Sequence, residues 1–248
     1  MTITDEELER YARHIVLQQV GGVGQRKLRS AGIAVIGAGG IGSAVIPALA
    51  GAGIGKITII DSDLVELTNL HRQPLFAESD AGKPKAELAA QFVKRLNHFV
   101  DAAPKRVRID PDNAADLLAG HNLVIDGSDN FATRLAVSDA SVSLGLPLIS
   151  AAAVQFQAQV GLFRSKPCYR CFVGDAFDAD DCDNCAELGV LGALTSTAGS
   201  FAALLAINTI VGIGEDQAGG VHLFDGEKLE WRMIRIPPDR HCKACGSA

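Results

Sequence analysis

The sequence lacks an excess of positive charge. Its 248 residues include 29 Asp and Glu against 23 Lys and Arg, which gives a formal net charge of −6 at pH 7. Proteins that bind nucleic acid broadly usually carry a basic surface, so this balance argues against nucleic-acid binding. Basic residues are therefore expected to matter only locally.

A secretory signal is also missing, because no apolar segment follows the opening M-T-I-T-D-E-E-L-E-R. We therefore expect a cytoplasmic protein with reduced cysteines. The six cysteines form three Cys-x-x-Cys pairs, Cys168/Cys171, Cys182/Cys185 and Cys242/Cys245. In a reducing compartment such pairs favour metal or redox work, and disulfides or unpaired core thiols are the alternative.

Two such pairs can bind one metal tetrahedrally and leave no coordination position open. This is typical of a structural zinc site, whereas a catalytic zinc keeps a position for water. We expect Zn²⁺ to attach the C-terminal segment to the body of the protein. The ligands expected are Cys168, Cys171, Cys242 and Cys245, although spacing alone leaves open which two of the three pairs bind the metal.

Long apolar runs are scarce. The one uncharged stretch of membrane-spanning length, residues 191–214, is rich in Gly, Ala, Ser and Thr and has no Lys/Arg-rich flank. We expect it to be a helix buried on several sides, with a dimer contact as one location, and we expect no membrane span. The chain has no internal repeat.

The remaining apolar runs predict an α/β fold. Five short runs alternate with helical stretches and are typical of parallel strands buried on both faces, at 33–36, 57–60, 107–109, 123–125 and 148–149. Later runs predict antiparallel strands at 154–163, 221–224 and 229–236, with Asp225-Gly226 in a turn. Thr4 and Glu7 predict a capping box that starts an amphipathic helix. The glycine-rich segment 21–24 is expected to end this helix.

A glycine-rich segment, G-A-G-G-I-G from Gly37 to Gly42, follows the first predicted strand and opens a helix. Glycines at such a turn let backbone N–H groups approach a phosphate. Asp61 ends the second strand, where a carboxylate can accept hydrogen bonds from a ribose. Together they predict a nucleotide site, and a turn needed only for packing is the alternative.

Polar segments then follow at the predicted strand ends: D-S-D-L-V-E-L-T-N-L-H-R-Q from Asp61, G-K-P-K-A at 82–86 and D-G-S-D-N at 126–130. Arg and Lys beyond the carboxyl ends of parallel strands can bind a triphosphate, and a carboxylate there can hold Mg²⁺. A nicotinamide-dependent oxidoreductase would share the glycines but needs none of these charges.

These motifs, together with R-Y-A-R-H, P-C-Y-R-C and C-K-A-C-G, resemble the ThiF/MoeB/HesA family of adenylyltransferases, bacterial relatives of ubiquitin-activating enzymes. The resemblance covers nearly the whole chain. It implies adenylation, with ATP and Mg²⁺, of the C-terminal glycine of a small ubiquitin-like sulfur-carrier protein ending in Gly-Gly. It also implies a Rossmann-like domain, a four-cysteine zinc site and a homodimer. Two alternatives stay open. The protein could act on a peptide or a tRNA-linked carboxylate, as some family members do, or it could be a non-catalytic partner of the family.

The resemblance also assigns roles. Asp61 resembles the ribose binder, Arg72 and Lys85 the phosphate ligands, and Asp129 the residue that positions Mg²⁺. Arg13 resembles the arginine that the family supplies to the partner subunit's site. The implied nucleotide-binding set is Gly37, Gly39, Gly40, Gly42, Asp61, Asp63, Asn69, Arg72, Gln73, Lys85, Asp129 and Asn130.

Cys185 lies where relatives place a loop cysteine that in the thiamine-pathway branch can link to the carrier, and an inert thiol is the alternative. Because no rhodanese extension follows, we expect a separate sulfur donor; the pathway, thiamine, molybdopterin or another, stays open. We expect a helical segment at 1–30, a nucleotide-binding Rossmann-like half at 31–150, and an antiparallel half at 151–248 with a crossover loop and the zinc site.

Overall fold

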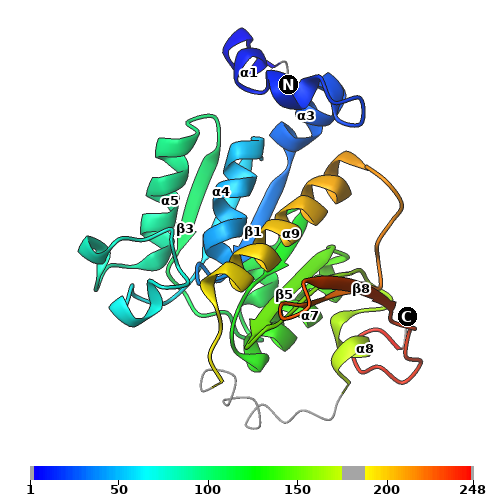
Figure 1. Ribbon diagram of the computed structural model, residues 1–248. Helices are drawn as coiled ribbons and strands as arrows, with labels where there is room; N and C mark the ends of the chain where they lie inside the picture. Colours follow the sequence, from blue (N-terminus) through cyan, green and yellow to red (C-terminus); the bar gives the residue numbers. More distant parts are fainter. Residues whose placement is uncertain (1–2, 175–187, 247–248) are drawn as a thin grey trace.

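The computed structural model describes residues 3–174 and 188–246, and its centre is a single eight-stranded sheet (Figure 1). The strand order is β3-β2-β1-β4-β5-β6-β7-β8. The first five strands are parallel and the last three continue the sheet antiparallel. The expected fold class, a mostly parallel α/β sheet extended by antiparallel strands, is confirmed.

The strands are β1 (Gly32–Ile36), β2 (Lys56–Ile60), β3 (Asp101–Lys105), β4 (Leu123–Asp126), β5 (Leu148–Val154), β6 (Gln157–Phe163), β7 (Gly220–Asp225) and β8 (Glu230–Arg235). The α-helices are α1 (Asp5–Arg10), α2 (Ala12–Ile15), α3 (Gly21–Ser30), α4 (Gly42–Ala52), α5 (Lys85–Leu96), α6 (Ala114–Leu118), α7 (Phe131–Leu144), α8 (Tyr169–Val173) and α9 (Gly192–Val211). Two 3₁₀ turns, η1 (Leu67–Asn69) and η2 (Glu78–Asp80), precede α5.

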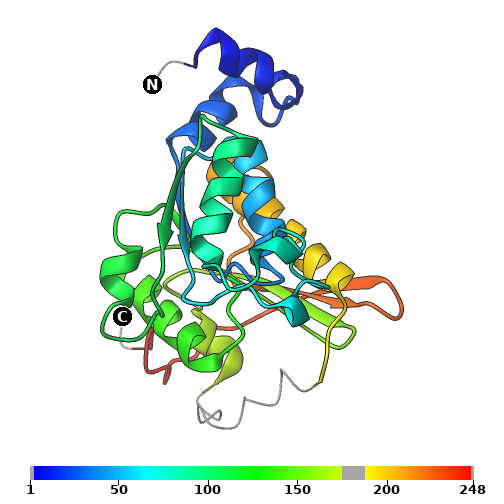
Figure 2. The same cartoon turned by 90° about the vertical axis from the view of Figure 1, so that its left-hand side faces the viewer.

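Helices cover both faces of the parallel strands, which is why those strands are apolar on both sides. In β1, Ile33 and Val35 pack into a core shared with α4, α5 and α9, whereas Ala34 and Ile36 pack into a second core with α6 and α7. In the sheet, β2 and β3 lie on one side of β1, and β4 and β5, which come later in the sequence, lie on its other side. This reversal between β1 and β4 is where α/β sheets of this kind bind ligands. In Figure 2 the turn of the β7–β8 hairpin, in orange, projects from the molecule, while Trp231 of β8 packs against Phe201 of α9 with 4.5 Å between the ring centroids.

One strand prediction was wrong. The expected strand at 107–109 is irregular, and the edge strand is β3, which pairs with β2 from Asp101 opposite Lys56 to Lys105 opposite Ile60. The sequence D-A-A-P-K has low β propensity, but an edge position tolerates Pro104 because only one side of the strand must be bonded. The antiparallel strand expected at 154–163 starts at Gln157, after a turn at Gln155, which has a positive φ of 52°.

The N-terminal prediction was partly wrong. The capping box between Thr4 and Glu7 is present, but the helix is interrupted at Tyr11. Tyr11 packs directly over Gly53, where a Cβ would come within 2.5 Å of the ring. The apolar face expected for the N-terminal amphipathic helix is largely exposed; the Val16 residue, for example, is 73% exposed. Glycines 21–24 begin α3 instead of ending a helix, and Gly24 allows close approach of Val211.

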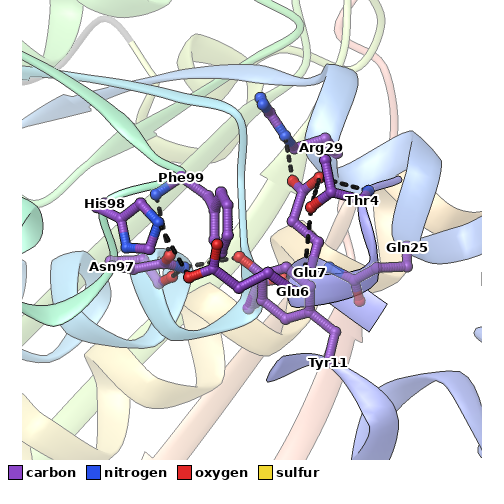
Figure 3. A network of polar contacts seen from close by, with 11 residues as sticks. Thr4, Glu6, Glu7, Tyr11, Gln25, Arg29, Asn97, His98 and Phe99 are labelled. Carbon is purple, nitrogen blue, oxygen red and sulfur yellow. Dashed lines mark hydrogen bonds and ion pairs between the residues drawn. The ribbon is translucent and has the colours of Figure 1, made fainter. Parts of the chain in front are cut away.

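Polar contacts attach these N-terminal helices to the body (Figure 3). Glu7 is buried and accepts a hydrogen bond from Arg29 at 2.6 Å. The buried Asn97 amide, just after α5, donates to the Tyr11 hydroxyl and to the Ala50 carbonyl, both at 2.7 Å. The N-terminal helices are thereby held at the C-terminal ends of α4 and α5.

The long apolar helix α9 has the length and composition of a membrane span, but half of its apolar stretch is buried. It packs against α4 and β5, in agreement with the buried helix expected for residues 191–214.

We expect Asn97→Ala to lower the free energy of unfolding by about 2–3 kcal/mol, because it removes two buried hydrogen bonds and leaves the Tyr11 hydroxyl without its donor. Urea unfolding measures the loss. The matched control is Asn122→Ala, whose exposed side chain accepts one bond from the Gly32 N–H at 2.7 Å; a loss of about 0.5–1 kcal/mol is expected there. Equal losses in the two variants would contradict the proposed anchoring.

Candidate active site

The glycine loop lies at the carboxyl end of β1, and its shape depends on glycine at two places. Gly37 has a positive φ of 85°, and a Cβ there would lie 3.2 Å from the Gly127 carbonyl of the loop after β4. A Cβ on Gly42 would lie 2.2 Å from the Gly37 carbonyl. The loop therefore folds tightly onto the start of α4, and its backbone is accessible to a phosphate.

Asp61 connects this loop to the end of β2. One carboxylate oxygen accepts the Ala38 N–H at 2.7 Å and the other accepts the Asp63 N–H at 2.8 Å. Burial raises the pKa of Asp61, against the effect of these two N–H donors and of the nearby Lys85 charge. A carboxylate has about four acceptor sites, so two remain for the hydroxyl groups of a ribose.

Lys85 is the first residue of α5 and is brought to Asp63 by backbone pairing. The Lys85 N–H donates to the Asp63 carbonyl at 3.0 Å, beside a bridge between Leu64 and Pro84. The Lys85 side chain is 6% exposed, and its amine lies 3.3 Å from the Asp63 carboxylate, which is 64% exposed. A buried cation with one solvated partner can exchange that partner for a phosphate oxygen.

Arg72 follows η1 and is oriented by its neighbours. Its guanidinium donates to the Asn69 side-chain oxygen at 2.5 Å and lies 2.9 Å from the His71 ring nitrogen. Gln73 is buried, and its Oε1 has no hydrogen-bond partner among the described residues. An unpaired buried acceptor in a cavity wall favours a bound ligand or water there.

The loop after β4 contributes Asp129 and Asn130. Asp129 is exposed and lines the cavity, and its charge helps to raise the pKa of Arg134. The Asn130 side chain caps α7 by accepting the Thr133 N–H at 2.8 Å. Asn130 therefore has a structural role in addition to any contact with a nucleotide.

These residues surround one cavity of about 1040 Å³. The predicted residues that line it are Gly37, Gly39, Gly40, Asp61, Asp63, Arg72, Gln73, Lys85, Asp129 and Asn130. Gly42 and Asn69 do not line it and act through the Gly37 turn and through Arg72. Arg13 is exposed on α2, before the start of β1, whereas the cavity lies beyond the end of β1. The structure therefore does not bring Arg13 into the cavity of its own chain.

Several lining residues escaped prediction from the sequence. Arg108 and Ile109 follow the edge strand, and Thr195 packs within 3.1 Å of the place where a Gly40 Cβ would stand. Arg134, on the first turn of α7, is buried. Burial works to lower the pKa of Arg134, but the charges of Asp126 and Asp129 and the influence of Tyr169 together outweigh burial, and the pKa is raised. An arginine four residues after the strand-end D-G-S-D-N segment was the one signal available.

A family model described as the ThiF family matches residues 11–246. The chain belongs to the ThiF family. It is 40% identical to a sulfur carrier protein adenylyltransferase of Thermus thermophilus, over 99% of this chain and 93% of the relative. It is 34% identical to a molybdopterin-synthase adenylyltransferase of Salmonella typhimurium, over 98% of each.

Solved structures agree with this assignment. The fold matches E. coli MccB, solved with ATP, at a TM-score of 0.83 and 25% identity, covering 96% of this chain and 74% of MccB. The family expected from the motifs, and the adenylyltransferase class that goes with it, are confirmed.

The ThiF-family chain also brings four cysteines together away from the cavity. The sulfur atoms of Cys168, Cys171, Cys242 and Cys245 all lie within 4.8 Å of one another. Sγ–Sγ distances of 4.0, 3.5 and 3.4 Å join Cys168 to Cys171, Cys168 to Cys242 and Cys171 to Cys245. Tetrahedral Zn–S bonds of about 2.3 Å place sulfurs about 3.8 Å apart, so the four thiols fit a zinc ion.

Burial raises the pKa of the Cys168 thiol, so a thiolate there needs a bound cation. Cys182 and Cys185 lie outside the described residues.

We expect about one metal ion per chain, lost in Cys168→Ser and in Cys242→Ser because each removes one of four thiolates. Elemental analysis by mass spectrometry measures it. Cys182→Ser is the control and should retain the metal. Loss of metal from Cys182→Ser with full retention in Cys242→Ser would show that a different pair completes the site.

Proposed function

We propose that this protein uses ATP to adenylate the C-terminal glycine of a small ubiquitin-like sulfur-carrier protein and releases pyrophosphate. The observation that carries the proposal is the single cavity that joins the glycine loop, the Asp61 carboxylate and the Arg72 and Lys85 cations. Full-length relatives named for activation of a sulfur carrier and of molybdopterin synthase support the choice of substrate.

The reaction brings two anions together. The carrier's terminal carboxylate attacks the α-phosphorus of ATP, the bond from that phosphorus to the bridging oxygen breaks, and pyrophosphate leaves with the electron pair. Negative charge builds on the leaving group, so fixed cations lower the barrier most where they face it. Arg72 and Lys85 are held for this task by Asn69 and Asp63.

Nucleotide orientation follows from the other walls of the cavity. The glycine loop offers backbone N–H groups to the phosphates, and Asp61 accepts the ribose hydroxyls. Asp129 supplies an exposed carboxylate that fits an Mg²⁺ ligand, as oxygen donors suit this ion. Mg²⁺ would supply further positive charge to the triphosphate when bound.

The pathway depends on the carrier. The family resemblance implies a carrier ending in Gly-Gly, and a separate sulfur donor would act on the adenylated product. Cys185, which could link to the carrier in the thiamine branch, lies outside the described residues. ATP–pyrophosphate exchange with each Gly-Gly-ending carrier of the host, one at a time, tests both the function and the pathway. No exchange with any carrier would overturn the proposal.

We expect Lys85→Ala, Arg72→Ala and Asp129→Ala each to lower carrier-dependent exchange about a hundredfold or more, because Lys85 and Arg72 stabilise the developing negative charge and Asp129 would hold the Mg²⁺ that does so. Lys83→Ala is the matched control. Lys83 lies two residues before Lys85, but its side chain is 53% exposed and pairs with Asp80 at 3.2 Å, so an effect within about twofold is expected. Near wild-type exchange in all three variants would show that the site is wrongly assigned.

Arg13 fits a role in a homodimer. It lies on α2, one of the N-terminal helices drawn in blue in Figure 1, whereas the cavity of its own chain lies beyond the carboxyl end of β1. We propose that it serves the cavity of a partner subunit, in line with the role that the family resemblance assigns to it.

Mixed dimers test this arrangement. Arg13→Ala and Lys85→Ala subunits, each inactive alone, should regain up to about a quarter of wild-type exchange after subunit mixing, because half of the dimers are then mixed and each has one complete site. Native mass spectrometry verifies that mixed dimers form. Their failure to regain exchange would place Arg13 outside the partner's site.

A further inference from the structure

The first turn of α7 contains a buried arginine to which none of the steps above gives a role. Arg134 is 8% exposed and lines the cavity. Its guanidinium donates to the Ser128 carbonyl, to the Ala151 carbonyl at 3.2 Å and to the Ser150 hydroxyl at 3.3 Å. A guanidinium held by several protein acceptors is fixed in place, so it orients those groups.

The bond to Ser128 has a direct consequence for the cavity. The Ser128 N–H donates to the Asp126 carboxylate at 2.9 Å, while its carbonyl accepts from Arg134. That carbonyl belongs to the planar peptide group between Ser128 and Asp129. The direction in which the Asp129 side chain leaves the backbone therefore depends on Arg134.

Tyr169 connects Arg134 to the four-cysteine cluster. It directly follows Cys168, is 3% exposed, and lines the cavity although none of the four cysteines does. Burial raises the pKa of its hydroxyl, and the nearby side chains of Arg134 and Ser150 act against this rise. Its ring stands edge-on to Phe163 with 5.5 Å between the centroids. Tyr169 is therefore fixed by the cysteine cluster at its backbone and reaches Arg134 at its hydroxyl.

We propose that Tyr169 and Arg134 are positioning residues that hold the Ser128–Asp129 peptide so that Asp129 can bind the Mg²⁺ of the nucleotide. The cysteine cluster then contributes to nucleotide binding through Tyr169, in addition to attaching the C-terminal segment. This inference rests on the Mg²⁺ role proposed for Asp129.

Tyr169→Phe tests the contact by removing one hydroxyl and keeping the ring. The Mg²⁺ concentration for half-maximal exchange should rise about fivefold, the effect of one lost polar contact to Arg134, while the carrier concentration for half-maximal rate stays unchanged. Arg134→Lys should cause a larger rise, about tenfold or more, because an ammonium cannot replace the forked donors. Ser150→Ala, which removes a hydrogen-bond partner of Arg134, should shift the Mg²⁺ dependence in the same direction. Metal content should remain at the wild-type value in all three.

The control breaks a different contact of the same helix. Arg170, the next residue of α8, donates to both oxygens of Asp139 on α7, at 2.6 and 2.7 Å. Asp139→Asn should keep the wild-type Mg²⁺ dependence, because Tyr169 and Arg134 remain in contact. A shift in Asp139→Asn as large as that in Tyr169→Phe would mean general loosening of α8, and would overturn the proposal.

Calorimetric binding of a non-hydrolysable ATP analogue at several Mg²⁺ concentrations, without carrier, separates this inference from the proposed function. If wild-type protein binds the Mg²⁺–nucleotide but adenylates no carrier, the proposed function fails and the Tyr169 effect can still be measured. If Tyr169→Phe and Arg134→Lys bind the analogue with wild-type Mg²⁺ dependence, the positioning role is overturned whatever the exchange assay shows.

Discussion

The hydrogen bond from the Ala38 N–H to the Asp61 carboxylate is the contact on which the nucleotide pocket depends. It joins the loop after β1 to the loop after β2. The buried carboxylate would be costly without donors, and burial does raise its pKa, so the backbone of both loops is constrained to supply them. Loop geometry is therefore fixed before any nucleotide arrives, and binding need not order it.

The same edge of the sheet shows how far the sequence could predict the structure. Strands β1, β2 and β4 are apolar on both faces and end in glycine-rich or polar motifs, so their type and the meeting of Asp61 with Asp129 followed from strand direction. Lys85 begins α5 and reaches this edge through the bridge between Leu64 and Pro84, which strand direction does not predict. Strand β3 could not be found this way. Its residues have little β propensity, and its existence depends on the free edge of β2, which only the assembled sheet provides.

Other features depend on contacts between distant segments, and local pattern does not record them. Arg134 has its role because the loop after β4, which contains Ser128, and β5, which contains Ser150 and Ala151, meet around it. The helix is interrupted at Tyr11, whose ring packs against Gly53 and whose hydroxyl accepts a hydrogen bond from Asn97. Three cysteine pairs of identical spacing are equivalent in sequence. The chain after β8 returns beside α8 and brings Cys242 and Cys245 to Cys168 and Cys171.

The antiparallel strands explain why this sheet can serve a two-substrate reaction. A parallel half alone forms the nucleotide end of the cavity, at the reversal between β1 and β4. The cavity continues along β5 and β6 to Gln157 and Gln159, and Arg232 of β8 lies at its wall. An acyl-adenylate can form only if the carboxylate of the second substrate reaches the α-phosphorus of ATP. The site must therefore extend beyond the space that a nucleotide fills. The strands that provide this extension lead into the segments that bear the four cysteines: β6 precedes Cys168 and Cys171, and β8 precedes Cys242 and Cys245.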